Sequence, residues 1–154
     1  ARAEPGSIYA TAEVLERSVH WVVKASGSRI KVSLDVPPQI PVCGSAGQMQ
    51  QVLVNLVQNA IDSTERQADA RLDIQGEVRS RSVVLTFRDN GPGFPEESLD
   101  KAFDPFFTTK PVGKGTGLGL SISYGIVERH RGQLKASNHP GGGAVLTLTL
   151  PLAG

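Results

Sequence analysis

The sequence contains one cysteine (Cys43), one methionine (Met49) and one tryptophan among its 154 residues. With a single cysteine, no disulfide can form within the chain, a cysteine-based zinc site is not expected, and a reducing compartment fits the composition. No long run of apolar residues is present, so we expect neither a transmembrane helix nor a secretory signal in this sequence. Because its only methionine is internal, we expect the chain to be a piece of a longer protein.

An excess of charge of either sign is also lacking. Lys and Arg number 16 and Asp and Glu number 15, so the formal net charge is +1. A protein that binds nucleic acid or a membrane surface through charge would carry a basic excess, so we expect neither partner. Hydrophobic residues make up 39% of the chain, which excludes compositional disorder, and 154 residues suffice for one domain.

Hydrophobic spacing of three and four residues predicts three helices. Thr11 is expected to cap the first helix and Gly27 to end it. Ser45 and Gln48 match a capping box at the start of the second helix, and Gly132 is expected to end the third. The predicted helices cover about residues 11–26, 46–66 and 116–131.

Alternation of apolar and polar residues predicts about five strands, at residues 29–36, 72–79, 83–88, 133–137 and 145–150. Strands that follow one another through short turns favour antiparallel pairing. The predicted fold is a two-layer α/β sandwich, in which a mixed, mostly antiparallel sheet is covered on one face by three helices. Residues 1–8 are interpreted as a leader or linker and residues 9–154 as one domain.

The second predicted helix carries a polar stripe opposite its apolar face, formed by Gln48, Gln51, Asn55, Asn59 and Asp62. A solvated face is the commoner explanation of such a stripe. Asn is a poor helix former, however, so two Asn residues one turn apart suggest a function. Because a carboxamide oxygen is a neutral, hard ligand, Asn59 and Asn55 are candidate Mg²⁺ ligands.

Two glycine-containing segments are candidate nucleotide-binding elements. Asp89 begins the turn Asp-Asn-Gly-Pro-Gly just after a predicted strand, where its carboxylate could accept a hydrogen bond from an exocyclic amine. Taken alone, a plain turn is the better interpretation. Residues 113–119, Gly-Lys-Gly-Thr-Gly-Leu-Gly, precede the third helix and could offer backbone N–H groups to phosphate. They match neither a Walker A loop nor a Rossmann fingerprint, since Gly115 follows Lys114 and no strand precedes them.

Residues 95–115 form a long segment with only short helical pieces, which is typical of a functional loop or lid. Its Phe-rich part, residues 103–107, could simply anchor the loop. Lys110 or Lys114 could meet a γ-phosphate as a point charge.

The order and spacing of these segments resemble the ATP-binding domain of sensor histidine kinases, over about residues 9–152. This superfamily also includes type II topoisomerases, a heat-shock chaperone and mismatch-repair ATPases. Residues 55–60 resemble its N box, residues 89–93 its G1 box, residues 103–107 its F box and residues 115–120 its G2 box. The Gly-rich turn at residues 141–144 fits as well. Residues 106–126 look especially similar to the C4-dicarboxylate type of membrane sensor.

The resemblance implies that ATP and Mg²⁺ are the cofactors. Asp89 would bind the adenine amine, Asn59 with Asn55 would hold Mg²⁺ against the phosphates, and Asn55, Asn59 and Lys110 would serve catalysis. The nucleotide pocket would also include the residues of the turn, lid and helix start, namely Asp62, Ser63, Gly91, Gly93, Phe94, Phe103, Thr108, Thr109, Lys110, Lys114, Gly115, Thr116, Gly117, Leu118, Gly119 and Leu120.

Two departures from the family pattern narrow the expected reaction. None of His20, His130 and His139 is followed by an acidic residue, as the family's phosphoacceptor is, so all three are interpreted as structural or surface residues. The histidine that accepts the phosphoryl group would therefore lie on a dimerisation domain outside this chain. The related ATPases carry a Glu where Asn55 stands, and an amide cannot take a proton from water. This favours phosphoryl transfer over hydrolysis.

The resemblance thus implies a histidine kinase domain that acts on the dimerisation domain of its own parent and, through it, on a response regulator. The parent would be an inner-membrane receptor with this domain in the cytoplasm, and the isolated chain would be a monomer. Two alternatives remain, an ATPase of the same superfamily and a non-enzymatic, nucleotide-gated binding module.

Overall fold

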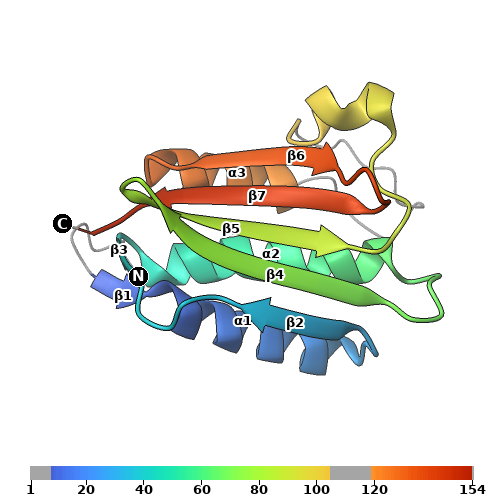
Figure 1. The fold of residues 1–154 in the computed structure, drawn as a ribbon, viewed down its shortest axis with the longest axis horizontal. Coiled ribbons are helices and arrows are strands. Elements are labelled where there is room, and N and C mark those ends of the chain that lie inside the picture. Colours follow the sequence, from blue (N-terminus) through green and yellow to red (C-terminus); the bar gives the residue numbers. More distant parts are fainter. Residues whose placement is uncertain (1–7, 105–118, 154) are drawn as a thin grey trace.

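The computed structural model describes residues 8–104 and 119–153, which form two sheets and three α-helices (Figure 1). The helices are α1 (Thr11–Ser26), α2 (Ala46–Ser63), the 3₁₀ helix η1 (Glu96–Lys101) and α3 (Gly119–Arg129). The strands are β1 (Ile8–Ala10), β2 (Lys31–Asp35), β3 (Pro41–Cys43), β4 (Arg71–Arg79), β5 (Ser82–Asp89), β6 (Gln133–Asn138) and β7 (Ala144–Pro151). None of the described helices is long and apolar enough to span a bilayer.

The main sheet has five strands in the order β2-β4-β5-β7-β6. Only β2 and β4 are parallel, and α2 lies on the crossover between them, whereas the other neighbours are antiparallel. Parallel strands need such a long connection, while antiparallel strands can be joined by a tight turn. The predicted mixed, mostly antiparallel sheet is confirmed, and β5 lies at its centre.

All three α-helices cover the same face of this sheet (Figure 1). Alternate residues of the central strands point into the interface, such as Leu85 of β5 and Leu148 of β7, both fully buried. Leu53 and Leu56 of α2 are also fully buried. The apolar faces that the sequence periodicity predicted for helices and strands therefore pack together in one core, and the predicted two-layer sandwich is confirmed.

The strands β1 and β3 were not predicted from the sequence. They form a separate two-stranded antiparallel sheet, in which Ile8 lies opposite Cys43 and Ala10 opposite Pro41. Strands of three residues are too short for alternation to be recognised, and their pairing joins segments about thirty residues apart. Ile8, interpreted from the sequence as part of a leader, thus lies in a paired strand.

Helix boundaries confirm two predicted caps and correct two others. Gly27 ends α1 as predicted, in the left-handed conformation with a φ of +65°. The hydroxyl of Ser45 accepts a hydrogen bond from the backbone N–H of Gln48 at 3.1 Å, as a capping box requires. Thr11 is not an N-cap; it is the first helical residue of α1, and its hydroxyl donates to the carbonyl of Ile40 at 3.0 Å. The positive φ after α3 belongs to Arg131 rather than to Gly132. The α2 helix ends at Ser63, three residues before the predicted end.

A histidine joins the start of α2 to the end of α3. The backbone N–H of Ser45 donates to Nε2 of His130 at 3.1 Å, and Nδ1 of the same ring lies 2.9 Å from the carbonyl of Ile126. Because a carbonyl only accepts, the Nδ1 atom is the donor toward Ile126, while Nε2 accepts from Ser45. The structural role expected for His130 is therefore the one observed.

Candidate functional site

Asp89 is the last residue of the central strand β5, and its side chain is almost completely buried, with 5% of the residue exposed. Its Oδ1 accepts hydrogen bonds from the backbone N–H of Gly91 at 2.9 Å and from that of Ala144 at 3.3 Å. Burial raises the pKa of Asp89 above its ordinary value, and these two amides partly oppose the rise. A buried carboxylate is thus held by one oxygen at the end of the sheet.

The glycines around Asp89 are required by close packing. A Cβ on Gly91 would lie 2.6 Å from the carbonyl oxygen of Ser63, at the end of α2. Any side chain on Gly143, which has a φ of +93°, would collide with the backbone oxygen of Asp89. The turn after β5 is therefore wedged between the end of α2 and the turn that joins β6 to β7.

Asn138 fixes the segment that leaves this turn. Its Oδ1 accepts a hydrogen bond from the N–H of Phe94 at 2.8 Å, and its Nδ2 donates to the carbonyl of the same residue at 2.7 Å. Gly93 makes this approach possible, because a Cβ there would lie 2.7 Å from Oδ1 of Asn138. Asn138 was not among the predicted site residues, since nothing in the local sequence pattern connects the end of β6 with a residue 44 positions earlier.

The two Asn residues of α2 face different surroundings. Nδ2 of Asn55 donates to the carbonyl of Gly119 at 3.3 Å and to the hydroxyl of Ser123 at 3.2 Å, both on α3. For Asn59, one turn further along, the described residues provide no side-chain partner; its backbone carbonyl accepts from the hydroxyl of Ser63 at 2.8 Å. The amide of Asn55 thereby joins the start of α3 to α2.

The other described residues predicted at the site lie around these elements. Oδ1 of Asp62 accepts from Nε2 of Gln58 at 3.0 Å on α2. Phe103 stacks on Tyr124 of α3 with the ring centroids 5.2 Å apart. Leu120 packs against the core from the first turn of α3. The turn 89–94, the end of α2 and the start of α3 are thus connected through contacts between distant segments.

Eight predicted site residues lie outside the described part of the chain: Thr108, Thr109, Lys110, Lys114, Gly115, Thr116, Gly117 and Leu118. Within residues 8–104 and 119–153, no group of three or more His, Cys, Asp or Glu side chains could hold a metal ion. The two residues predicted as Mg²⁺ ligands, Asn55 and Asn59, both lie on α2, and each carries a carboxamide oxygen of the kind that a hard cation accepts.

Comparison with known proteins identifies the family. Residues 44–154 match the family model described as histidine kinase-, DNA gyrase B- and HSP90-like ATPase, and these residues include α2, Asp89 and the turn between β6 and β7. The chain belongs to this ATPase family. The family binds ATP, so the predicted nucleotide cofactor is confirmed at the level of the domain.

Curated relatives connect the chain with two-component signalling. It is 43% identical over 116 residues to the C4-dicarboxylate transport sensor protein DctB of Pseudomonas aeruginosa, covering 73% of this chain and 19% of that protein. It is 35% identical over 127 residues to the signal transduction histidine-protein kinase BaeS of Escherichia coli, covering 80% of this chain and 27% of BaeS. The chain therefore spans less than a third of the length of these relatives.

Solved structures agree in fold. A mycobacterial sensor histidine kinase, MprB, superimposes with a TM-score of 0.85 at 25% identity, covering 96% of this chain and 97% of that one. A nucleotide-free catalytic domain of histidine kinase ThkA gives 0.83 at 32% identity, covering 96% of both chains. Together with the family model, these relatives place the chain among the ATP-binding catalytic domains of sensor histidine kinases.

Proposed function

We propose that this domain transfers the γ-phosphoryl group of ATP to a histidine on a dimerisation domain of its parent protein, from which a response regulator receives it. The observation that carries the proposal is the buried carboxylate of Asp89, fixed through one oxygen at the end of β5 and close to the amide-bearing helix α2. The family match and the lengths of the relatives support a catalytic domain within a longer kinase.

Asp89 would recognise adenine. The two amide donors of Gly91 and Ala144 both bind Oδ1, so Oδ2 is the oxygen available to a ligand amine. A charge-assisted hydrogen bond in a buried site is stronger than a neutral one and is not weakened by competing water. The close packing of Gly91 and Gly143 keeps the carboxylate from moving when the base enters.

Asn59 and Asn55 would hold Mg²⁺ against the phosphates. Mg²⁺ retains most of its waters and binds one or two protein oxygens together with phosphate oxygens, which suits two carboxamides one helical turn apart. When bound, the ion would neutralise charge on the phosphates. Because Nδ2 of Asn55 is engaged by Gly119 and Ser123, its Oδ1 is oriented independently of the metal. The same contact ties a metal ligand to the first turn of α3.

Transfer is favoured over hydrolysis by the chemistry of α2. An Asn at position 55 supplies no base that could activate water, so the domain positions ATP and stabilises charge while the acceptor histidine provides the nucleophile. The contribution of Lys110 or Lys114 at the γ-phosphate remains a prediction. We place the domain on the cytoplasmic side of an inner-membrane receptor, because ATP and response regulators are cytoplasmic.

Two measurements test this function. An ATP titration with and without Mg²⁺ should show tighter binding with the metal. Addition of a purified dimerisation domain with its histidine should then give phosphohistidine, and the domain alone should show no steady ATP turnover. Steady turnover without an acceptor would favour the ATPase alternative. Nucleotide binding without any phosphorylation of the acceptor would favour a nucleotide-gated binding module.

A further inference from the structure

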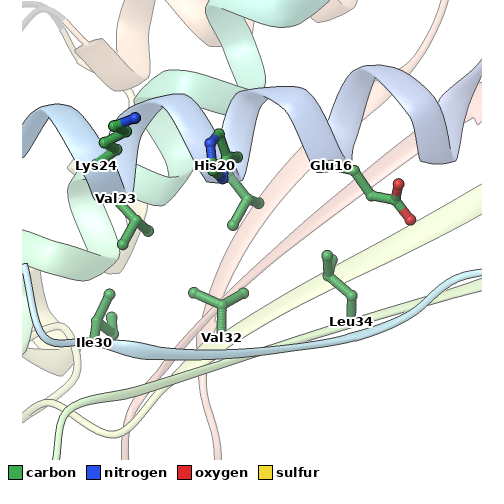
Figure 2. Close-up of a pocket in the computed structure, with 8 residues that line it drawn as sticks. Glu16, His20, Val23, Lys24, Ile30, Val32 and Leu34 are labelled. Atoms are coloured by element: carbon green, nitrogen blue, oxygen red, sulfur yellow. The ribbon is translucent and has the colours of Figure 1, made fainter.

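A groove lies between α1 and β2, the strand at the border of the main sheet (Figure 2). Its volume is about 550 Å³, and its strand side is apolar, with Ile30, Val32 and Leu34 pointing toward the helix. Leu34 is 39% exposed although it lies on the face that the helices cover. An apolar strip at this position is therefore open at the border of the sheet.

The strand that forms this border has one free edge. β2 is the first strand in the sheet order, and among the described strands it pairs only with β4. The N–H of Lys31 donates to the carbonyl of Ala70, on the β4 side, at 2.9 Å. Because backbone groups alternate in direction along a strand, the N–H and C=O groups of Val32 and Leu34 point to the open edge. They are available to a further strand.

The two ends of this border carry side chains of opposite charge. Glu16 lies over Leu34 on the helix side of β2 (Figure 2). Asp35, the next residue, points to the opposite face of the strand, so both faces carry an acidic side chain at this end.

At the other end Lys24 lies over Ile30 on the helix side (Figure 2). Lys31, on the opposite face of the strand, also adds a positive charge there, although its Nζ lies 3.5 Å from the exposed carboxylate of Asp69. When two copies of such a border lie antiparallel about a two-fold axis, the acidic end of each copy faces the basic end of the other.

We infer that the free edge of β2 pairs antiparallel with β2 of a second copy of this chain, about a two-fold axis at Ser33. This register places Val32 opposite Leu34 of the second copy as a hydrogen-bonded pair, which uses the backbone groups that face outward. It also places Lys31 directly opposite Asp35 of the second copy, and the symmetry repeats both pairs.

The second copy is favoured over an unrelated peptide because one register satisfies three independent features. The outward backbone groups are paired, the exposed side chain of Leu34 is covered by the half-buried Val32 of the second copy, and each basic end meets an acidic end. The contact joins short strands, so it is weak and acts where two copies are held close together. β4 separates this edge from the strand of Asp89, so the inference does not rest on the proposed phosphotransfer.

The proposed register between the two β2 strands can be tested by reversing single charges in the full 154-residue chain. In Lys31→Asp an acidic residue faces Asp35 of the second copy, and in Asp35→Lys a basic residue faces Lys31. Each variant alone should self-associate at least about tenfold more weakly than the unaltered chain, because two attractive pairs become repulsive. An equal mixture of the two variants should associate again, since every facing pair is then of opposite charge.

Sedimentation velocity at concentrations up to about 1 mM suits such a weak contact. Lys135→Asp, an exposed reversal on β6 at the opposite edge of the sheet, is the matched control and should leave association unchanged. Thermal unfolding should show that all variants fold; the ion pair of Lys31 with Asp69 is exposed, so its loss costs little. A chain that stays monomeric over this range, a mixture no better than its components, or an equal effect of Lys135→Asp would overturn the inference.

Discussion

Replacement of Asp89 by Asn changes the chemistry of the proposed adenine contact while preserving its shape. The amide oxygen of Asn can still accept from the N–H groups of Gly91 and Ala144, which now bind Oδ1. Its NH₂ group then occupies the position of Oδ2, where the amine of adenine would meet a donor instead of an acceptor. The variant should therefore fold normally and bind ATP weakly.

The size of the effect follows from the burial of Asp89. A hydrogen bond to a charged group contributes about 1.5–3 kcal/mol. Since about 1.4 kcal/mol corresponds to a factor of ten, the Kd for ATP should rise roughly 10- to 150-fold. Calorimetry with ATP and with the inosine nucleotide, which carries an oxygen in place of the amine, measures the preference for adenine. An ATP to inosine nucleotide ratio equal to that of the unaltered chain would refute the role of Asp89.

Although Asp89→Asn should weaken ATP binding, it should not lower the free energy of unfolding of the nucleotide-free domain at neutral pH. Because burial raises the pKa of Asp89, the native state binds more protons than the unfolded state between the ordinary value of 3.8 and the raised one. Stability therefore falls as the pH rises through this window, and the deficit persists at neutral pH. Asn cannot ionise, so the nucleotide-free variant should be at least as stable at pH 7 and less dependent on pH. Asp73→Asn, exposed on β4, is the control and should change neither property.

Three further substitutions test the rest of the site. Asn59→Ala should lower the affinity for Mg·ATP more than that for metal-free ATP, and equal losses in a titration would contradict the metal assignment. Asn138→Ala removes both bonds to Phe94, so amide exchange at residues 91–94 should accelerate and ATP should bind more weakly, whereas Ser137→Ala should have no effect. Gly143→Ala should destabilise the fold by more than about 1 kcal/mol in denaturant unfolding, because it combines a positive φ with a collision against Asp89; an unchanged midpoint would contradict the packing.

Much of the candidate site could be proposed from the sequence because its signals are local. The position of Asp89 directly after an alternating strand, the glycines that follow it and the helical spacing of Asn55 and Asn59 all lie within short windows of sequence. The structure adds what these residues contact. Asn55 was predicted as a metal ligand and catalytic residue beside Asn59, and the structure adds that its amide binds α3 through Gly119, 64 residues away.

The sequence by itself determined the layers of the fold and the chemical groups that the candidate site can offer. Apolar periodicities of about two and three to four residues decide which side of each strand and helix is buried, and residue types decide which side chains can bind a cation or an amine. Tertiary structure alone decided the pairing of β1 with β3, the hold of Asn138 on Phe94 and the position of β2 at an open edge. These features depend on which distant segments become neighbours, and no spacing within a single segment encodes that choice.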